Sequence, residues 1–217
     1  DSSVVSIKDV YWGPEYSDNE IQESLKKYSI KYEYYNEIEK KIALCLSKGK
    51  VVTHFYGRME FGPRSLGNRS ILYPATEPSV NNWLNQKLER SEFMPFAPVT
   101  LSEHAKECYL NIEGAEETAQ FMTITFECTD KMKEQSPAVV HVDGTARPQI
   151  ISEKINPRYH KILSEYFNLT GIASIVNTSF NMHEEPIVCS PDDAINAFMK
   201  SNLDYLAIGC FLVKNED

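Results

Sequence analysis

The spacing of hydrophobic residues predicts a helix followed by a buried strand in the first third of the chain. From residue 36 onward, apolar side chains recur every three or four positions, and Gly49 follows the last of them as a helix C-cap would. Residues 50–56, KVVTHFY, are rich in β-branched and aromatic side chains, which favours a short buried strand. This strand leads into a segment rich in glycine and arginine, residues 57–70.

The rest of the pattern predicts alternating helices and strands. Helices are expected over residues 79–89, 102–110, 156–169 and 190–201, and strands over residues 121–126, 139–142, 172–176 and 205–213. Ser79, Ser102 and Ser190 are the expected N-caps, and Gly171 is expected to end the third of these helices. Short connections between such elements indicate a single α/β or α+β domain, with helices packed on a sheet.

The start of the chain has a weaker pattern than the rest. We expect residues 1–35 to form a lead-in segment with one short helix around residues 20–27, and residues 36–217 to form the domain itself. The first residue is Asp1, and the opening is polar and rich in turn residues. We therefore expect the chain to be a piece of a longer protein, with residues 1–35 linking it to a missing N-terminal domain.

Composition excludes several classes of protein. With 42% hydrophobic residues among 217, the chain can bury a full core, and its net charge of −9 opposes general binding to nucleic acid or to an anionic membrane. No window approaches 18 apolar residues, and the first 18 residues have neither a basic n-region nor an apolar h-region, so we expect neither a membrane span nor secretion. Five cysteines without a CxxC pair suit reduced thiols, so we expect a cytoplasmic protein.

Residues 57–70, GRMEFGPRSLGNRS, are the first candidate for a binding site. Arg58, Arg64 and Arg69 stand there with three glycines and a single acid, inside a chain that is acidic overall. Guanidinium groups bind carboxylates and phosphates in a bidentate way, and glycine lets a backbone approach a ligand. The segment therefore predicts a site for a small polyanion such as a nucleotide, although pairing with surface acids is the alternative. It contains neither a P-loop nor a GxGxxG fingerprint.

A second polar cluster, VNTSFNMHEEP, follows the strand predicted over residues 172–176. Its small polar side chains would lie where α/β sheets usually bind ligands, at the carboxyl end of a strand. They could hold phosphate or ribose oxygens, or they could simply stabilise a turn. Arg147, in HVDGTARPQ, is a further candidate for binding an anion. The cluster residues in question are Asn177, Thr178, Ser179 and Asn181.

The histidines give no support for a metal site on this chain. They stand at positions 54, 104, 141, 160 and 183 and show neither HxxxH nor HExxH spacing. His141 and His183 are nearest the polar clusters, but each is better explained as an ordinary surface or hydrogen-bonded histidine than as a general base. No Ser-His-Asp or Cys-His arrangement follows from the spacings, so nothing indicates nucleophilic catalysis.

Four sequence blocks carry a family resemblance. GRMEFGPRSLGNRSIL, EFMPFAP, HVDGTARPQ and VNTSFNMHEEPIV resemble, in the same order, the C-terminal domain of the NodU/CmcH carbamoyltransferase family. The resemblance spans about residues 11–214 and implies a YrdC-like fold, a twisted mixed β-sheet flanked by helices. It also implies a partner absent from this chain, an N-terminal ASKHA-type domain that carries histidine-bound iron.

The resemblance implies an activity as well. In this family the YrdC-like part is thought to form carbamoyl adenylate from ATP and carbamoyl phosphate, and the other domain passes the carbamoyl group to a hydroxyl of a sugar or natural product. Mg²⁺ is expected to arrive with the nucleotide, because phosphates usually carry that ion. Because the other domain carries out the transfer, the resemblance implies that sugar or antibiotic acceptors bind outside this chain.

Two motifs of YrdC-like proteins locate the site. SxN is matched by Ser179 and Asn181, whereas KxR keeps Arg90 but has Leu88 in place of the lysine, so that Lys87 would have to substitute. Relatives commonly read KxRExFRPFAP, and Met94 replaces the arginine before the proline here. The resemblance and the charge pattern together give Arg69, Arg90 and Lys87 as catalytic residues, and Arg58, Arg64, Asn68, Ser70, Arg147, Asn177, Thr178, Ser179 and Asn181 as ligands of substrate or nucleotide.

Three other functions stay open at this point. A YrdC relative could make a different adenylate, such as threonylcarbamoyl adenylate, although no threonine pocket is evident. The departures at Leu88 and Met94 could instead mark a non-catalytic nucleotide-binding or supporting module. RNA binding, known for some YrdC-like proteins, is weakened by the net charge of −9.

Overall fold

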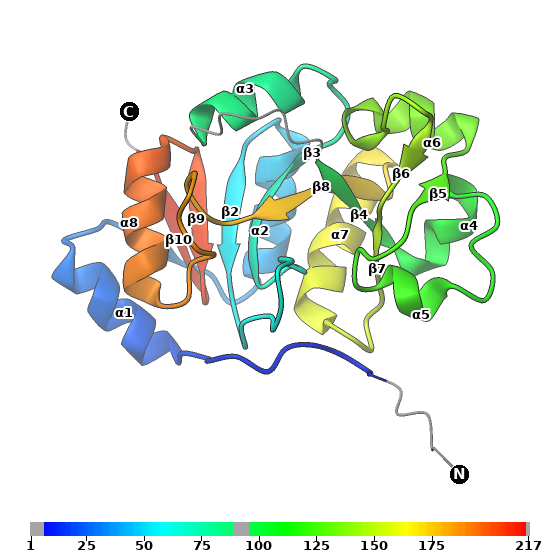
Figure 1. The fold of residues 1–217 in the computed structure, drawn as a ribbon. Coiled ribbons are helices and arrows are strands. Elements are labelled where there is room, and N and C mark those ends of the chain that lie inside the picture. Colours follow the sequence, from blue (N-terminus) through cyan, green and yellow to red (C-terminus); the bar gives the residue numbers. More distant parts are fainter. Residues whose placement is uncertain (1–6, 89–95, 216–217) are drawn as a thin grey trace, which may run out of the picture.

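A computed structural model describes residues 7–88 and 96–215 of the chain and shows a large mixed sheet (Figure 1). The strand order across it is β1-β10-β9-β2-β3-β8-β4-β7, and β5 and β6 form a separate two-stranded sheet. The strands are β1 Glu33–Tyr34, β2 Val52–Phe55, β3 Arg69–Pro74, β4 Ala97–Leu101, β5 Phe126–Glu127, β6 Thr145–Ala146, β7 Gln149–Ile151, β8 Ser174–Ser179, β9 Tyr205–Ile208 and β10 Phe211–Lys214.

Helices cover both faces of this sheet. The α-helices are α1 Asp18–Lys27, α2 Ile38–Ser47, α3 Val80–Lys87, α4 Ala105–Cys108, α5 Glu116–Ala119, α6 Asp130–Gln135, α7 Pro157–Thr170 and α8 Pro191–Ser201, with 3-10 turns η1 at Ser102–His104 and η2 at Pro137–Val139. One core layer packs α2 and α7 against the sheet, and the other packs α1, α3 and α8 on the opposite face (Figure 1). The predicted fold class, a mixed sheet flanked by helices, is confirmed.

The sheet is mostly antiparallel. Only β2 with β9 and β4 with β7 run parallel, among the strands that the structure describes. Near the middle of the sheet, Asn177 of β8 stands opposite Leu72 of β3 on one side and Ala97 of β4 on the other. A polar side chain at such a central position must find partners within the protein, because water does not reach it.

Part of the expected lead-in segment belongs to the core. The short helix predicted around residues 20–27 is α1, which begins with a capping box between Ser17 and Glu20. Its apolar side chains Ile21 and Leu25 are buried in the layer that includes α8. Strand β1 then pairs with β10 at the edge of the sheet, so these elements are integrated with the rest of the fold.

The helices with the clearest apolar periodicity are confirmed, and so are most of their ends. Asn156 caps α7 by accepting a hydrogen bond from the Tyr159 backbone N–H, and Gly171 ends it with φ of +73°. Ser190 caps α8 in a capping box. Ser79 stands at the N-cap of α3, but its side chain makes no capping hydrogen bond.

Several sequence predictions are wrong. Of the strand predicted over residues 121–126, only Phe126 is in a strand, β5, and residues 121–125 form turns and irregular structure before it. Residues 139–142 leave η2 into a turn instead of forming a strand. The strand predicted over 205–213 is a hairpin, β9 and β10, which Gly209 divides with φ of +59°. The helix predicted over 102–110 is reduced to η1 and α4, and Ser102 bonds to the Glu103 carboxylate instead of capping a helix.

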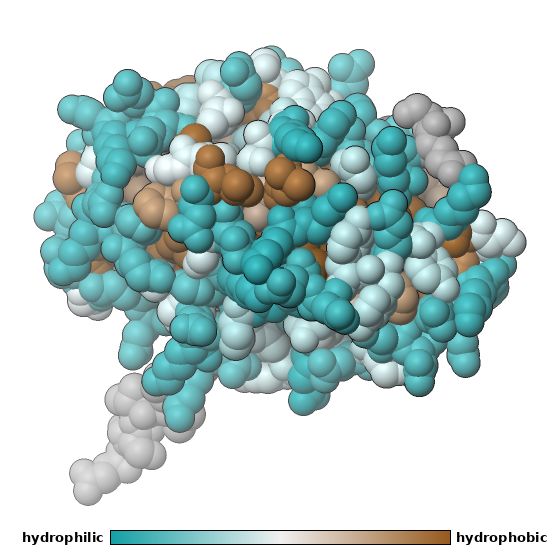
Figure 2. Space-filling model, turned by 180° about the vertical axis from the view of Figure 1, so that it is seen from behind, coloured by the Kyte–Doolittle hydropathy of each residue, from teal (hydrophilic) through white to brown (hydrophobic). Residues whose placement is uncertain are grey.

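Figure 2 shows the molecule from behind relative to Figure 1, with mostly hydrophilic residues on the surface and small hydrophobic groups between them. Over residues 7–88 and 96–215, no helix has the length and apolar character needed to cross a membrane.

Candidate functional site

The segment 57–70 is fixed by the one acid it contains. Glu60 is buried, and its Oε1 accepts hydrogen bonds from the backbone N–H groups of Leu66 at 2.7 Å, Asn68 at 2.8 Å and Arg69 at 3.3 Å. Burial raises the pKa of Glu60, while these N–H donors act in the opposite direction. The carboxylate therefore holds the loop between β2 and β3 in one path.

Side chains from distant parts of the chain hold the same loop. Tyr11 donates its hydroxyl hydrogen bond to the Leu66 carbonyl at 2.9 Å, and the Gln149 amide donates to the same oxygen at 2.8 Å. Asn177 donates to the Ser65 carbonyl at 3.2 Å. Sequence reasoning missed Tyr11, Glu60 and Gln149, and only Glu60, the single acid in a basic segment, gave a signal.

Arg69 lies inside the fold, beneath this loop. It is fully buried, and its two Nη atoms donate to the backbone carbonyls of Tyr56, Asn68, Gly57 and Pro14 at 2.9–3.4 Å. The guanidinium carbon is 3.7 Å from the centroid of the Phe55 ring. Burial lowers the pKa of Arg69 to about 10. The structure thus places this predicted catalytic residue among backbone carbonyls.

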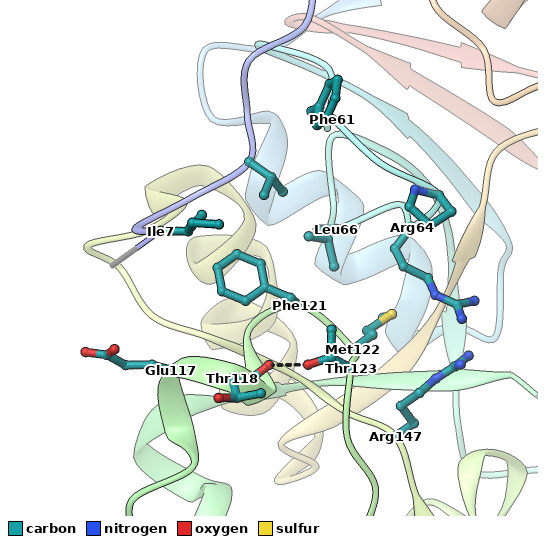
Figure 3. A pocket seen from close by; sticks show the side chains of 12 residues that line it. Ile7, Phe61, Arg64, Leu66, Glu117, Thr118, Phe121, Met122, Thr123 and Arg147 are labelled. Atoms are coloured by element: carbon teal, nitrogen blue, oxygen red, sulfur yellow. Dashed lines mark hydrogen bonds between the residues drawn. The ribbon is translucent and has the colours of Figure 1, made fainter. Parts of the chain in front are cut away.

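A cleft of about 760 Å³ lies beside the loop, and two arginines stand at one end of it (Figure 3). The guanidinium groups of Arg64 and Arg147 lie near one another, whereas Phe61, Leu66 and Phe121 supply an apolar wall. Burial and the neighbouring charge of Arg64 lower the pKa of Arg147. Such a cleft suits an anion that has an apolar body, because the apolar wall and the paired cations are available to the same ligand.

The second polar cluster lies directly beside the loop. The Phe180 backbone N–H donates to the Arg69 carbonyl at 3.0 Å, and the His183 N–H donates to the Leu88 carbonyl at 3.2 Å. Asn181 donates to the carbonyls of Met182 and Glu185, as a turn-stabilising residue does. Thr178 and Ser179 are the last two residues of β8. The block that matches SxN therefore joins the arginine-rich loop to the end of α3.

The remaining predicted site residues lie in different places. Asn68 is buried and bonded to the Arg58 carbonyl and to Asn156, and Ser70 accepts from the Gly67 N–H. Arg58 is exposed and donates to the carbonyls of Trp12 and Gly13. Lys87 is exposed on α3 and donates to the Asn202 carbonyl, outside the wall of the cleft, and Arg90 lies outside the described residues.

The position aligned with the family lysine is part of the hydrophobic core. Leu88 is 1% exposed and packs in the same layer as Leu84 of α3. A side chain one position earlier on the helix is turned by about 100°. This rotation explains why Lys87 faces solvent and reaches Asn202 instead of the loop.

No cluster of three or more metal-ligating side chains occurs in the part of the chain that the structure describes. Three of the histidines lie beside exposed acids: His104 is 3.0 Å from Glu107, His160 is 2.6 Å from Glu103, and His183 is 3.7 Å from Glu184. His141 contacts Thr145 at 3.2 Å.

His54, on β2, supports the loop from below and gives a prediction about pH. Its Nδ1 lies 2.6 Å from the Gly67 carbonyl, which can only accept, so Nδ1 carries the proton. Burial lowers the pKa of His54 to about 4. The unfolded chain, in which histidine titrates near pH 6.5, therefore binds more protons between pH 6.5 and 4, and stability is lost as the pH falls through this range.

We expect the free energy of unfolding to fall by about 2 kcal/mol between pH 7 and pH 5 because of His54. Urea titrations at both pH values measure this loss, and His54→Asn, which has no titrating group, is the matched variant. An equal loss of stability in His54→Asn and in the wild type would contradict the assignment.

Taken together, these features define an α/β domain whose mixed sheet carries an arginine-rich loop beside a cationic and apolar cleft. The sequence profile of the family described as "Carbamoyltransferase C-terminus" matches residues 43–215. The chain belongs to this family, as the four sequence blocks predicted.

Curated relatives resemble the chain over nearly its whole length. It is 38% identical over 212 residues to the uncharacterized protein MJ1058 of Methanocaldococcus jannaschii, covering 95% of this chain and 34% of that protein. It is 36% identical over 214 residues to nodulation protein NolNO of Sinorhizobium fredii, covering 96% and 31%. The chain thus spans about a third of the length of these curated relatives.

Two solved structures share the fold at low sequence identity. Full-length HypF in the phosphate- and nucleotide-bound form aligns with a TM-score of 0.57 and 17% identity, covering 87% of this chain and 22% of that one. HypF of T. kodakarensis aligns with a TM-score of 0.57 and 18% identity, covering 80% and 21%. This likeness supports the fold class reached from the sheet and its helices.

Proposed function

We propose that the chain is the C-terminal domain of an O-carbamoyltransferase and forms carbamoyl adenylate from ATP and carbamoyl phosphate. An iron-binding, ASKHA-type N-terminal domain would then transfer the carbamoyl group to the hydroxyl of a sugar or natural product. Family membership supports a transferase. The phosphate and nucleotide named for the HypF structure support a nucleotide site on the shared fold.

The observation that carries this proposal is the pair of arginines at the end of the cleft. Water first hydrolyses carbamoyl phosphate to carbamate and inorganic phosphate; a carbamate oxygen then joins the α-phosphorus of ATP, and pyrophosphate leaves. Both reactants are anions, so their repulsion must be neutralised and their approach fixed. Arg64 and Arg147 line the same end of the cleft and would act together on one anionic group, and the apolar wall with Phe61 and Phe121 could hold the uncharged part of the nucleotide.

The loop after β8 would form a second part of the same site. Ser179 is the half-buried last residue of β8 and Asn181 follows it two positions later, and the His183 N–H donates to the Leu88 carbonyl at the end of α3. Arg90 follows that helix in the sequence and is proposed, with Lys87, to serve as the KxR motif does in relatives. Mg²⁺ would be held chiefly by the nucleotide phosphates, as is usual for this ion. The five free thiols agree with action in the cytoplasm.

Arg147→Ala and Arg64→Ala are expected to weaken binding of a non-hydrolysable carbamoyl-adenylate analogue by about tenfold or more each. The reason is the loss of a charge-assisted contact in a partly desolvated cleft. Calorimetric titration of the 217-residue chain measures the affinity directly.

Lys48→Ala is the matched control, because it removes one exposed positive charge just after α2 without touching the cleft. Its affinity should equal that of the wild type. If both arginine variants bind the analogue as tightly as the wild type does, the analogue binds outside this cleft and the assignment is wrong.

A non-catalytic nucleotide-binding module is the second candidate, and one observation favours it. The family lysine is replaced by the buried Leu88, while Lys87 is engaged with Asn202 on the surface. Exchange of labelled pyrophosphate into ATP, dependent on carbamoyl phosphate, distinguishes the two candidates. Analogue binding together with absence of this exchange in the full-length protein would favour the module.

A further inference from the structure

Two buried polar atoms beside the arginine-rich loop lack partners. Ser65 is 4% exposed and Asn177 is 2% exposed, yet Ser65 Oγ and Asn177 Oδ1 make no hydrogen bond to any described residue. Native proteins rarely leave buried polar groups unpaired, because desolvation without a partner costs stability. Such atoms therefore indicate a place where a ligand supplies the missing partner.

The orientation of the Asn177 amide is fixed by its neighbours. Its Nδ2 donates to the Ser65 carbonyl at 3.2 Å and to Gln149 Oε1 at 2.8 Å. Gln149 cannot rotate its own amide, because its Nε2 donates to the Leu66 carbonyl at 2.8 Å. Both neighbours of Nδ2 are thus acceptors, so the unpaired atom of Asn177 is the oxygen, which requires a donor.

Ser65 stands between Arg64 and Leu66, which both line the cleft, whereas Asn177 lies on β8 behind them. Ser65 directly follows Arg64, and Gln149, which holds Asn177, comes two residues after Arg147. Arg147 Nε is buried and also has no partner among the described residues. Two buried acceptors, Asn177 Oδ1 and Ser65 Oγ, and one buried donor, Arg147 Nε, thus lack partners in the segments that surround the cleft.

We propose that Asn177 Oδ1 and Ser65 Oγ bind the amino group of the carbamoyl moiety and select it over acetyl and carboxyl groups. The inference rests on the proposed function and names the specificity of its site. A carbamoyl group attached to a phosphate offers N–H donors next to an anion, which matches the unpaired oxygens of Ser65 and Asn177 and the unpaired Nε of Arg147. The hydroxyl of Ser65 can accept one N–H while Asn177 accepts the other.

Competing acyl groups fit this arrangement less well. An acetyl group places a methyl where the amino group would be and leaves both protein atoms unpaired. A carboxyl group that is ionised places oxygen lone pairs against the Asn177 oxygen. Sites built around hydrogen bonds to a substrate NH discriminate strongly against analogues without it.

The test compares two ligands that differ in one group: carbamoylsulfamoyl adenosine and acetylsulfamoyl adenosine, in which CH3 replaces NH2. Calorimetric titration of the wild-type chain should give about tenfold tighter binding of the carbamoyl compound. Ser65→Ala should reduce this preference several-fold and leave the affinity for the acetyl compound unchanged. Ser65 Oγ has no partner in the structure, so this variant keeps the contacts of the fold.

Asn177→Ala should abolish the preference, but it also removes two hydrogen bonds that hold the loop, which makes Ser65→Ala the decisive variant. Arg147→Ala is the matched control and should weaken both compounds equally. Equal binding of the two compounds by the wild type, or an unchanged preference in Ser65→Ala, would overturn the inference while the proposed function stands. Failure of the wild type to bind either compound would overturn both.

Discussion

Gly67→Ala is expected to lower the free energy of unfolding by about 4 kcal/mol, as the sum of two effects. Gly67 has φ of +114°, a conformation that residues with a Cβ rarely adopt. A Cβ at this position would also lie 2.3 Å from a ring carbon of Tyr159, which is fully buried on α7. Neither group can move away easily, since the Gly67 carbonyl is bound to His54.

Gly62→Ala separates the two effects. Gly62 lies in the same loop with φ of +116°, but nothing stands within 4 Å of an added Cβ. This control should cost only about 1–2 kcal/mol, from backbone strain alone. Urea titration of both variants measures the difference. Equal losses of unfolding free energy in the two variants would show that the loop packs less tightly against α7 than the structure indicates.

Arg69→Ala is expected to lower the free energy of unfolding by about 3–5 kcal/mol. The guanidinium donates to four backbone carbonyls, of Pro14, Tyr56, Gly57 and Asn68, so its removal leaves buried acceptors unpaired and a cavity over Phe55. The carbonyls of Tyr56, Gly57 and Asn68 lie at the two ends of the loop between β2 and β3, and that of Pro14 lies in the N-terminal segment. The variant should therefore lose order where these segments meet.

Two further variants test this explanation. Arg69→Lys keeps the charge but has neither the planar fork nor enough donors for four carbonyls, so we expect it to recover only part of the lost stability. Arg58→Ala removes an exposed arginine of the same loop and should change stability by about 1 kcal/mol or less. Chemical denaturation measures all three. A stable Arg69→Ala protein with lost ligand affinity would instead support a direct role of Arg69 in binding.

The arginine-rich segment, residues 57–70, shows what composition can and cannot predict about a binding site. Its charge against an acidic background indicated an anion site, and Arg64 does stand with Arg147 at the end of the cleft. Composition could not separate Arg64 from Arg69, because both have the same side chain in the same segment. Whether a guanidinium faces a cleft or a ring of carbonyls depends on how β3 begins, and β3 was absent from the sequence prediction.

The missed strands have a common cause. β3, β4 and β7 lie in the middle or at the edge of the sheet and have proline, serine or glutamine among their residues, so their own pattern is weak. They are strands because their neighbours supply hydrogen-bond partners: β8 pairs with both β3 and β4. Strand formation here depends on tertiary pairing more than on intrinsic propensity.

The sequence by itself determined the family, the mixed α/β fold class and the helices whose apolar faces repeat every three or four residues. Periodicity and capping are local, so they can be read without a partner, as at Ser190 and Gly171. Only the tertiary structure decided that Glu60, Tyr11 and Gln149 hold the loop, that Leu88 is buried where relatives have lysine, and that Ser65 and Asn177 have buried atoms without partners. These properties arise from contacts between residues up to 112 positions apart, which no local pattern records.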